Sequence, residues 1–136
     1  AGVGLAAPQV GFSIRLFITD GAAFAKEGVK DFKKVFINPV MLEQEGAAWS
    51  FNEGCLSIPD LRGVVPRSAS IVCEAMDRTG KPIKLEVDNF FARVIQHEWD
   101  HFQVNVYLYR MSNLRSLSHL SEFARFCTRE EGEDKR

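Results

Sequence analysis

The stretch QHEWDH, residues 96–101, decides how this chain is interpreted. On a helix, His97 and His101 lie one turn apart, about 6 Å along the axis. Both imidazoles then project from one face and can bind the same metal ion. Glu98 follows the first histidine and can reach a water at that metal without being a ligand. A single histidine would indicate an ordinary helix residue, whereas this His-Glu-x-x-His spacing is typical of metal hydrolases.

The residues around this motif predict a helix over residues 88–103. Asp88 is a suitable N-cap, because its carboxylate can accept a hydrogen bond from a backbone N–H of the first turn. Two apolar stripes follow the helical period and predict a helix that packs into a core. One stripe contains Phe90 and Val94 with the two histidines, and the other contains Phe91, Ile95 and Phe102 with Trp99 beside it.

Length and composition predict a single soluble domain. The chain has 136 residues, of which 46% are hydrophobic, and a net charge of −1. This charge gives no reason to expect a nucleic acid or an anionic membrane as a partner, and no apolar run is long enough to span a bilayer. The three cysteines form no Cys-x-x-Cys pair and do not suggest a disulfide framework. We therefore expect a cytoplasmic or organellar protein rather than a secreted one.

The remaining segments predict strands before the helix and a second helix after it. Expected strands cover residues 14–19, 35–38 (stopped by Pro39), 40–45 and 47–51 (a hairpin across Glu45 and Gly46), 70–76 and 83–87 (joined by a turn at 77–80), and 106–109. A second helix is expected over 118–128, followed by a frayed charged tail at 129–136. This order predicts an α+β fold, with short antiparallel sheets around a central metal-binding helix and a C-terminal helix.

The first eleven residues, AGVGLAAPQVG, allow two interpretations. Their small side chains and Pro8 are typical of a flexible loop. The same glycine-rich backbone could instead approach a ligand closely, with Gln9 as its polar group.

Two histidines need a third protein ligand, and the residues offer two candidates. Val104 and Tyr107 stand where an extended metzincin motif needs glycine and histidine, which excludes that class. Glu122, on the later helix, could be the third ligand, as a glutamate is in thermolysin-like peptidases. Cys55 is favoured because a glycine turn precedes it and could expose its sulfur, although an isolated cysteine is more often a small buried apolar residue.

Three segments together resemble the signature motifs of peptide deformylase, in that family's order. They are GVGLAAPQ at residues 2–9, EGCLS at 53–57 and QHEWDH at 96–101, and the resemblance extends from residue 1 to about 127. It implies a single catalytic domain over residues 1–136. The activity it implies is removal of the formyl group from the N-terminal formyl-methionine of new polypeptides, with release of formate.

The resemblance also implies a role for individual residues. Cys55, His97 and His101 would bind the metal, Glu98 would be the general acid and base, Gln9 and the Leu56 N–H would donate to the oxyanion, and Gly4 would lie along the substrate. Phe90 and Val94, on the histidine face, are expected to line the methionine pocket. The family's native metal is typically Fe(II), while zinc, nickel or cobalt can occupy purified protein. Arg62 and Glu53 are expected either as an ion pair or as residues near the substrate.

The chain departs from the family pattern at three places. Val104 replaces the usual glycine after the second metal histidine, which should alter the end of the helix. The chain starts almost at the first motif, where the family usually has several tens of earlier residues. The mixed charges of residues 129–136 do not favour the ribosome docking seen in some members. Two alternatives stay open: an inactive deformylase-like protein that binds peptide or metal, and a metallopeptidase that uses Glu122.

Overall fold

The computed structural model describes residues 3–21, 33–103 and 106–127. The chain forms two compact units. Unit 1 comprises Ala1–Trp49 and Arg67–Val106, and unit 2 comprises Ser50–Pro66 and Tyr107–Arg136. Each unit is built from two separate stretches of the chain. The expectation of one catalytic domain stays a prediction.

Unit 1 contains an antiparallel sheet with the strand order β1-β2-β3-β4-β5 in the described part of the chain. Its strands are β1 (Gly4–Ala6), β2 (Leu16–Thr19), the first part of β3 (Lys34–Cys55), the last part of β4 (Ile58–Met76) and β5 (Pro82–Asp88). β2 confirms the strand expected at 14–19, and the pairing of Ser70 with Asp88 through Met76 with Pro82 confirms the expected partners. The predicted α+β architecture is confirmed.

Strand β3 does not stop at Pro39, so that prediction is wrong. The ladder between β2 and β3 ends with Leu16 opposite Ile37, and the missing proline N–H therefore removes no bond from it. Asn38 takes a left-handed backbone conformation with φ of 48°. Its N–H donates to the Arg15 carbonyl at 2.8 Å, and the Arg15 guanidinium donates to the Pro39 carbonyl at 2.9 Å. These bonds carry the strand through the bend.

The hairpin expected across Glu45 and Gly46 is also absent, because β3 continues through both residues. Gly46 has a φ of +84°, which suits glycine, so it makes a local bend within the strand rather than a reversal. A Cβ at this position would lie 3.1 Å from the Cβ of Ala69 in β4. The strands are consequently longer than the short ones expected from the turn residues.

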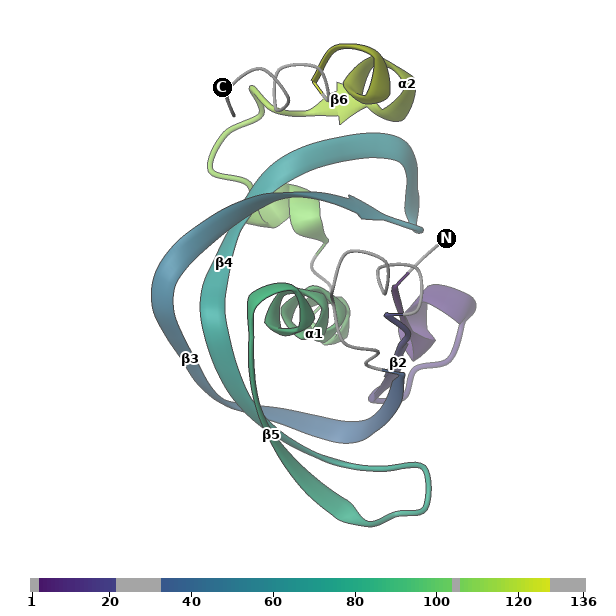
Figure 1. The fold of residues 1–136 in the computed structure, drawn as a ribbon. Helices are drawn as coiled ribbons and strands as arrows, with labels where there is room; N and C mark the ends of the chain where they lie inside the picture. Colours follow the sequence, from purple (N-terminus) through teal and green to yellow (C-terminus); the bar gives the residue numbers. More distant parts are fainter. Residues whose placement is uncertain (1–2, 22–32, 104–105, 128–136) are drawn as a thin grey trace. The chain divides into compact units, whose positions relative to one another are not determined.

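The helix α1 spans Asn89–Phe102 and agrees with the predicted range. Asp88 occupies the N-cap position in an extended conformation, but its side chain makes no capping hydrogen bond in the described part of the chain. α1 packs against β1, β2 and β5. Figure 1 shows the helix nearly end-on beside these strands. The helix is thus held by the sheet of unit 1 over several strands.

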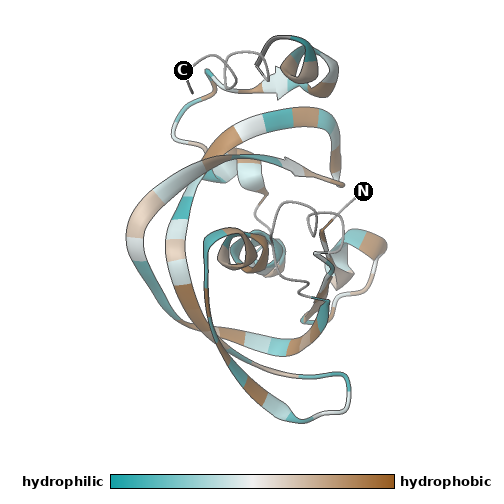
Figure 2. Ribbon diagram, in the orientation of Figure 1, coloured by the Kyte–Doolittle hydropathy of each residue, from teal (hydrophilic) through white to brown (hydrophobic). Residues whose placement is uncertain are grey.

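The core of unit 1 lies between α1 and the sheet. Hydrophobic and hydrophilic residues form bands along the strands, as Figure 2 shows. Phe17 and Phe36 stack with ring centroids 4.5 Å apart. The buried core consists of Ala6, Phe17, Phe36, Ile71, Cys73, Ala75, Ala92 and Ile95, and Ile83, Leu85, Val87, Phe91 and Phe102 are among the partly buried residues around it. The predicted helix stripe of Phe91, Ile95 and Phe102 therefore reaches this core.

The turn between β4 and β5 is the one that the sequence predicts. The carboxylate of Asp77 accepts hydrogen bonds from the Thr79 N–H at 2.9 Å, the Thr79 hydroxyl at 2.6 Å and the Lys81 N–H at 3.0 Å. These bonds lower the pKa of Asp77, the Thr79 hydroxyl contributing most. Gly80 has a φ of +82°, which completes the reversal.

Unit 2 contains the other parts of β3 and β4 and three short elements, and it corrects two predictions. Residues Tyr107–Arg110 form a 3₁₀ helix where a strand was expected. Ser118–His119 form strand β6, paired with Arg62 and Leu61, and helix begins only at Leu120. It runs as α2 (Leu120–Glu122) and continues as a π-helical turn, Phe123–Cys127. The start is delayed because His119 Nδ1 accepts a hydrogen bond from the Ser121 N–H at 3.3 Å.

Two expectations lie outside the described residues: the effect of Val104 on the end of α1, and the fraying of residues 129–136. α1 ends in a C-cap at Gln103. Among the helices of the described ranges, none has both the length and the apolar character that crossing a membrane requires.

Candidate metal and catalytic site

Helix α1 brings His97 and His101 together. Their imidazole centroids are 5.3 Å apart, the rings are inclined by 70°, and both side chains are partly buried. The arrangement follows from the four-residue spacing on a regular helix. Two imidazoles on one face offer nitrogen ligands that suit zinc, iron or nickel.

Glu98 lies against the backbone of β1. Its side chain is 3% exposed. A Cβ added at Gly4 would lie 2.6 Å from Glu98 Oε1 and 2.9 Å from both Cδ and Cγ. Any side chain at position 4 would require Glu98 to shift, so Gly4 provides the space that the Glu98 carboxyl fills. Whether Gly4 also lies along a substrate stays a prediction.

The segment after β1 is an ordered 3₁₀ helix, Ala7–Val10, rather than a flexible loop. Gln9 lies within it, and its Oε1 accepts a hydrogen bond from the Ala6 N–H at 2.8 Å. This bond sets the orientation of the side-chain amide, since the oxygen must face Ala6 and Nε2 then points the other way. Gly11, with φ of +90°, ends the helix. The orientation of the amide leaves Gln9 able to act as a donor.

A polar contact between α1 and β4 was not predicted from the sequence. Gln96 exchanges hydrogen bonds with the main chain of Ser68, and Asp100 forms a buried ion pair with Arg67. The signal that could have found these residues is their spacing. Gln96 and Asp100 are polar, lie four residues apart, and belong to a helix that is also apolar on its neighbouring faces.

Cys55 is the last residue of β3, in unit 2, and its side chain is partly buried. Arg62 braces the strand end before it: Nε donates to Asn52 Oδ1 at 2.5 Å, and Nη2 donates to the Asn52 carbonyl at 3.3 Å. A Cβ at Gly54 would lie 3.1 Å from Arg62 Nη1, so the glycine makes room for the guanidinium. These contacts favour a structural role for Arg62. The Leu56 side chain is exposed in the turn that follows.

Tyr107 lies near Cys55 within unit 2. Burial raises the pKa of the Tyr107 hydroxyl, electrostatic interactions with Cys55 and Glu53 raise this pKa further, and the Arg62 guanidinium lowers it. The phenol is therefore neutral near pH 7. Glu53, 6% exposed, belongs to the same environment, and this burial would not have been expected of an acidic residue from the sequence.

Within unit 1, His97 and His101 are placed to supply two ligands to one metal ion. Cys55, which belongs to unit 2, stays the predicted third ligand. Glu122, the alternative third ligand, is an exposed residue of α2. The two residues expected to line a methionine pocket differ in exposure: Val94 is buried in α1, and Phe90 is partly buried.

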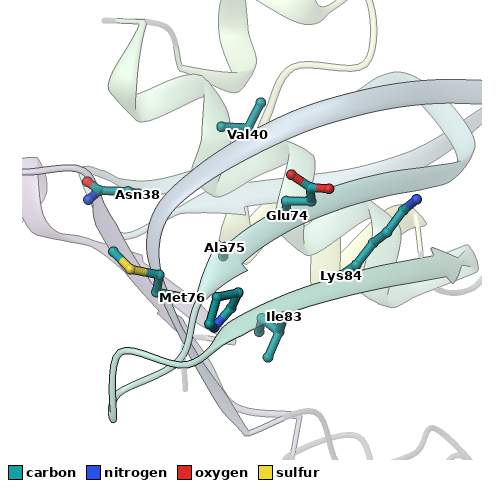
Figure 3. Close-up of a pocket in the computed structure, with 8 residues that line it drawn as sticks. Asn38, Val40, Glu74, Ala75, Met76, Ile83 and Lys84 are labelled. Atoms are coloured by element: carbon teal, nitrogen blue, oxygen red, sulfur yellow. The ribbon is translucent and has the colours of Figure 1, made fainter.

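A hollow on unit 1 is separate from these residues. Figure 3 shows that it is lined from three strands, by Asn38 and Val40 of β3, Glu74 and Met76 of β4, and Ile83 and Lys84 of β5, among others. None of the candidate metal or catalytic residues lines it. We assign it no part in the site.

The fold and the site define a class of protein: an α+β protein whose long helix packs against an antiparallel sheet and carries a His-Glu-x-x-His motif with a buried glutamate. The sequence model of the polypeptide deformylase family matches residues 1–116. The chain therefore belongs to the polypeptide deformylase family.

Known proteins agree with this assignment. The peptide deformylase of Flavobacterium psychrophilum is 51% identical over 111 residues, covering 75% of this chain and 57% of the relative. That of Christiangramia forsetii is 42% identical over 123 residues, covering 84% and 63%. The chain thus spans about three fifths of the length of these curated relatives.

Solved structures give the same result for the fold. A peptide deformylase from Synechococcus elongatus, in complex with actinonin, has a TM-score of 0.74 at 36% identity, covering 82% of this chain and 57% of that one. A class I type b peptide deformylase from Acinetobacter baumannii has a TM-score of 0.75 at 34% identity, covering 81% and 70%.

Proposed function

We propose that the protein is a metal-dependent hydrolase that removes the formyl group from N-terminal formyl-methionine of nascent polypeptides and releases formate. The observation that carries this proposal is the buried Glu98 next to a histidine pair on one helix, in a chain of the deformylase family. The substrate is an N-formyl-methionyl peptide.

Cys55, His97 and His101 are proposed to hold one divalent metal ion. A thiolate and two imidazoles suit Fe(II), zinc, nickel and cobalt, and they leave a further position for water and substrate. Fe(II) is the proposed native ion, by analogy with the family. When bound, the metal acts as a Lewis acid that lowers the pKa of water and polarises the formyl carbonyl.

Glu98 is proposed to move the proton. Its carboxylate accepts the proton of the attacking water as oxygen bonds to the formyl carbon, and then gives that proton to the leaving amine as the C–N bond breaks. The products are formate and a free peptide amino group. The contact with Gly4 fixes the side chain, because a buried carboxyl packed against a backbone has little space to move.

Gln9 and the backbone N–H of Leu56 are proposed to stabilise the oxyanion that develops on the formyl oxygen. The bond from the Ala6 N–H to Gln9 Oε1 supports this for Gln9, since it directs the donor Nε2 away from β1. A donor of this kind contributes about 2.7–4 kcal/mol to transition-state stabilisation in other enzymes. Phe90 and Val94 are proposed to line the methionine pocket, and Gly4 to lie along the peptide.

A cytoplasmic or organellar location is proposed with this activity. Cys55 and Cys73 form no disulfide in the described residues, which is compatible with a reducing compartment. No observation supports ribosome docking, and the inactive deformylase-like alternative has none in its favour.

The experiment measures formate release from a formyl-Met peptide by protein purified without oxygen and loaded with Fe(II), beside a metal-free control. We expect metal-dependent release and inhibition by actinonin, the compound bound to the Synechococcus elongatus relative. Glu98→Gln should keep its metal and lose turnover, whereas Cys55→Ser should lose metal. A folded, metal-loaded protein that releases no formate would contradict the proposed activity.

A further inference from the structure

The side-chain amide of Gln96 makes a two-point contact with the main chain of Ser68 in β4. Its Oε1 accepts a hydrogen bond from the Ser68 N–H at 3.1 Å, and its Nε2 donates to the Ser68 carbonyl at 2.9 Å. Nε2 also donates to the Ala92 carbonyl at 3.1 Å, one turn earlier in α1. The side chain is buried, so these bonds fix it between helix and strand.

This contact continues the ladder of β4 where β5 leaves it. β5 pairs with β4 as far as Asp88, opposite Ser70, and the chain then turns into α1. Ser68 lies two residues beyond Ser70, and strand residues two apart direct their backbone polar groups to the same neighbour. The Gln96 amide therefore takes the place of the next strand residue. It supplies partners to a backbone N–H and C=O that would be costly to bury without them.

A second contact lies one helical turn further on. Arg67 Nη1 donates to Asp100 Oδ2 at 2.9 Å, and both side chains are only 4% exposed. Removing one member would leave the other charge buried without its counterion, which is strongly unfavourable. Because Arg67 directly precedes Ser68, two consecutive residues of β4 hold α1 at two points.

Each of the two anchored residues of α1 directly precedes one of the two histidines in the sequence. His97 directly follows Gln96, and His101 directly follows Asp100. At 3.6 residues per turn, each histidine is rotated by about 100° around the helix axis from the anchored residue before it. Turning α1 about its axis would therefore move both imidazoles together. Anchors one turn apart oppose both rotation and sliding of the helix.

We propose that Arg67 and Ser68, through Gln96 and Asp100, are positioning residues that fix the rotation of α1 and thereby aim His97 and His101 at the metal. We call this set of four the β4 clamp. None of its members is a ligand. The inference rests on the proposed function, because it takes the two histidines as metal ligands.

The test uses Co(II) alone as the probe, bound to the full chain. Gln96→Met keeps the length of the side chain and removes its three hydrogen bonds. We expect Co(II) affinity, measured by competition with a chelator, to fall about 10- to 100-fold, as it does when supporting partners of metal ligands are removed. We also expect the d–d absorption bands to shift, since they report the coordination geometry. If Gln96→Met does not fold, Gln96→Glu tests the same contact, because it keeps the acceptor for the Ser68 N–H, loses both donated bonds and should also weaken Co(II) binding.

A matched control separates positioning from general stability. Ile71→Ala removes a core residue of β4 that takes no part in the clamp, and urea unfolding identifies conditions under which it and Gln96→Met are equally folded. The clamp is overturned if Gln96→Met binds Co(II) as the wild type does, or if Ile71→Ala weakens binding equally. Wild-type binding that His97→Ala abolishes would support the metal site independently. A wild type that binds no Co(II) would overturn the proposed metal site and the clamp together.

Discussion

Gly4→Ala tests the contact between β1 and the proposed proton-transfer residue. The added methyl would lie 2.6 Å from Glu98 Oε1 and 2.9 Å from Cγ, whereas ordinary van der Waals contact begins at 3.4 Å. The oxygen must therefore retreat by 3.4 − 2.6 = 0.8 Å. The carboxyl oxygen alone could swing aside, but Cγ is held close to the helix backbone. Moving it requires a change of the first side-chain torsion in a buried residue.

The size of the effect follows from this displacement. A misplacement of about 1 Å at a reacting group can cost about 100-fold in rate, so we expect kcat for formyl-Met peptide hydrolysis to fall by about that factor. Overpacking a buried site should also lower the free energy of unfolding by about 1–3 kcal/mol. Metal content should be unchanged, because Glu98 is not a proposed ligand and the histidines lie elsewhere on the helix surface.

A double-mutant cycle checks the reasoning without relying on activity. Glu98→Ala removes Cγ, Cδ and Oε1, the three atoms that a methyl at Gly4 would meet. In that background, Gly4→Ala should cost clearly less stability than in the wild type, as urea unfolding would show. Equal costs in the two backgrounds would refute the steric explanation. A fall in kcat/KM through KM alone would instead indicate that the methyl obstructs the substrate.

Three further predictions concern unit 1. Burial raises the pKa of Cys73 to about 11 from 9.0, so the folded state keeps a proton that the unfolded chain loses. The free energy of unfolding should therefore fall as pH rises from about 9 toward 11, by up to about 2–3 kcal/mol. Cys73→Ala should flatten this pH dependence, as urea titrations at several pH values would show. The pKa of Asp77 is lowered, so the ionised carboxylate stabilises the folded state above the unfolded pKa near 3.8, and this stabilisation is lost as pH falls through the folded pKa. Asp77→Asn should shift the acid-unfolding curve. Identical curves for the variant and the wild type would show that the Asp77 hydrogen bonds do not stabilise the turn. Arg93 is buried, donates a hydrogen bond to the Trp49 carbonyl, and its guanidinium lies 4.7 Å from the centre of the Trp49 ring. Arg93→Met should lower the free energy of unfolding by about 1–3 kcal/mol and change the tryptophan emission. An unchanged free energy of unfolding would show that the contact does not stabilise the fold.

The features that sequence alone predicted are those with local causes. The placement of His97 and His101 on one face needs only a helix, and the Asp77 turn needs only neighbouring residues. Pro39 and Gly46 show the limit of such reasoning. Both residues interrupt strands in general, yet here β3 continues through them, because the register of the neighbouring strand spares the proline and the glycine needs only a bend.

The contacts that shape the site join distant parts of the chain. Gly4 and Glu98 are 94 residues apart by their numbers, and Gln96 lies 28 residues from Ser68. No periodicity or spacing rule reports which backbone a buried glutamate will meet. The resemblance to a family predicted roles for individual residues, Gly4 among them. The steric reason for a glycine at position 4, its contact with Glu98, can be seen only in the folded structure.

The bonding of Gln96 to main-chain atoms has a consequence for how sequences of this fold can vary. Every residue except proline offers the same N–H and C=O at position 68, so the contact places no demand on the side chain there. Position 96, by contrast, requires a primary amide of one length. A saturation library should therefore accept many residues at 68 and few at 96, although the two positions share one contact.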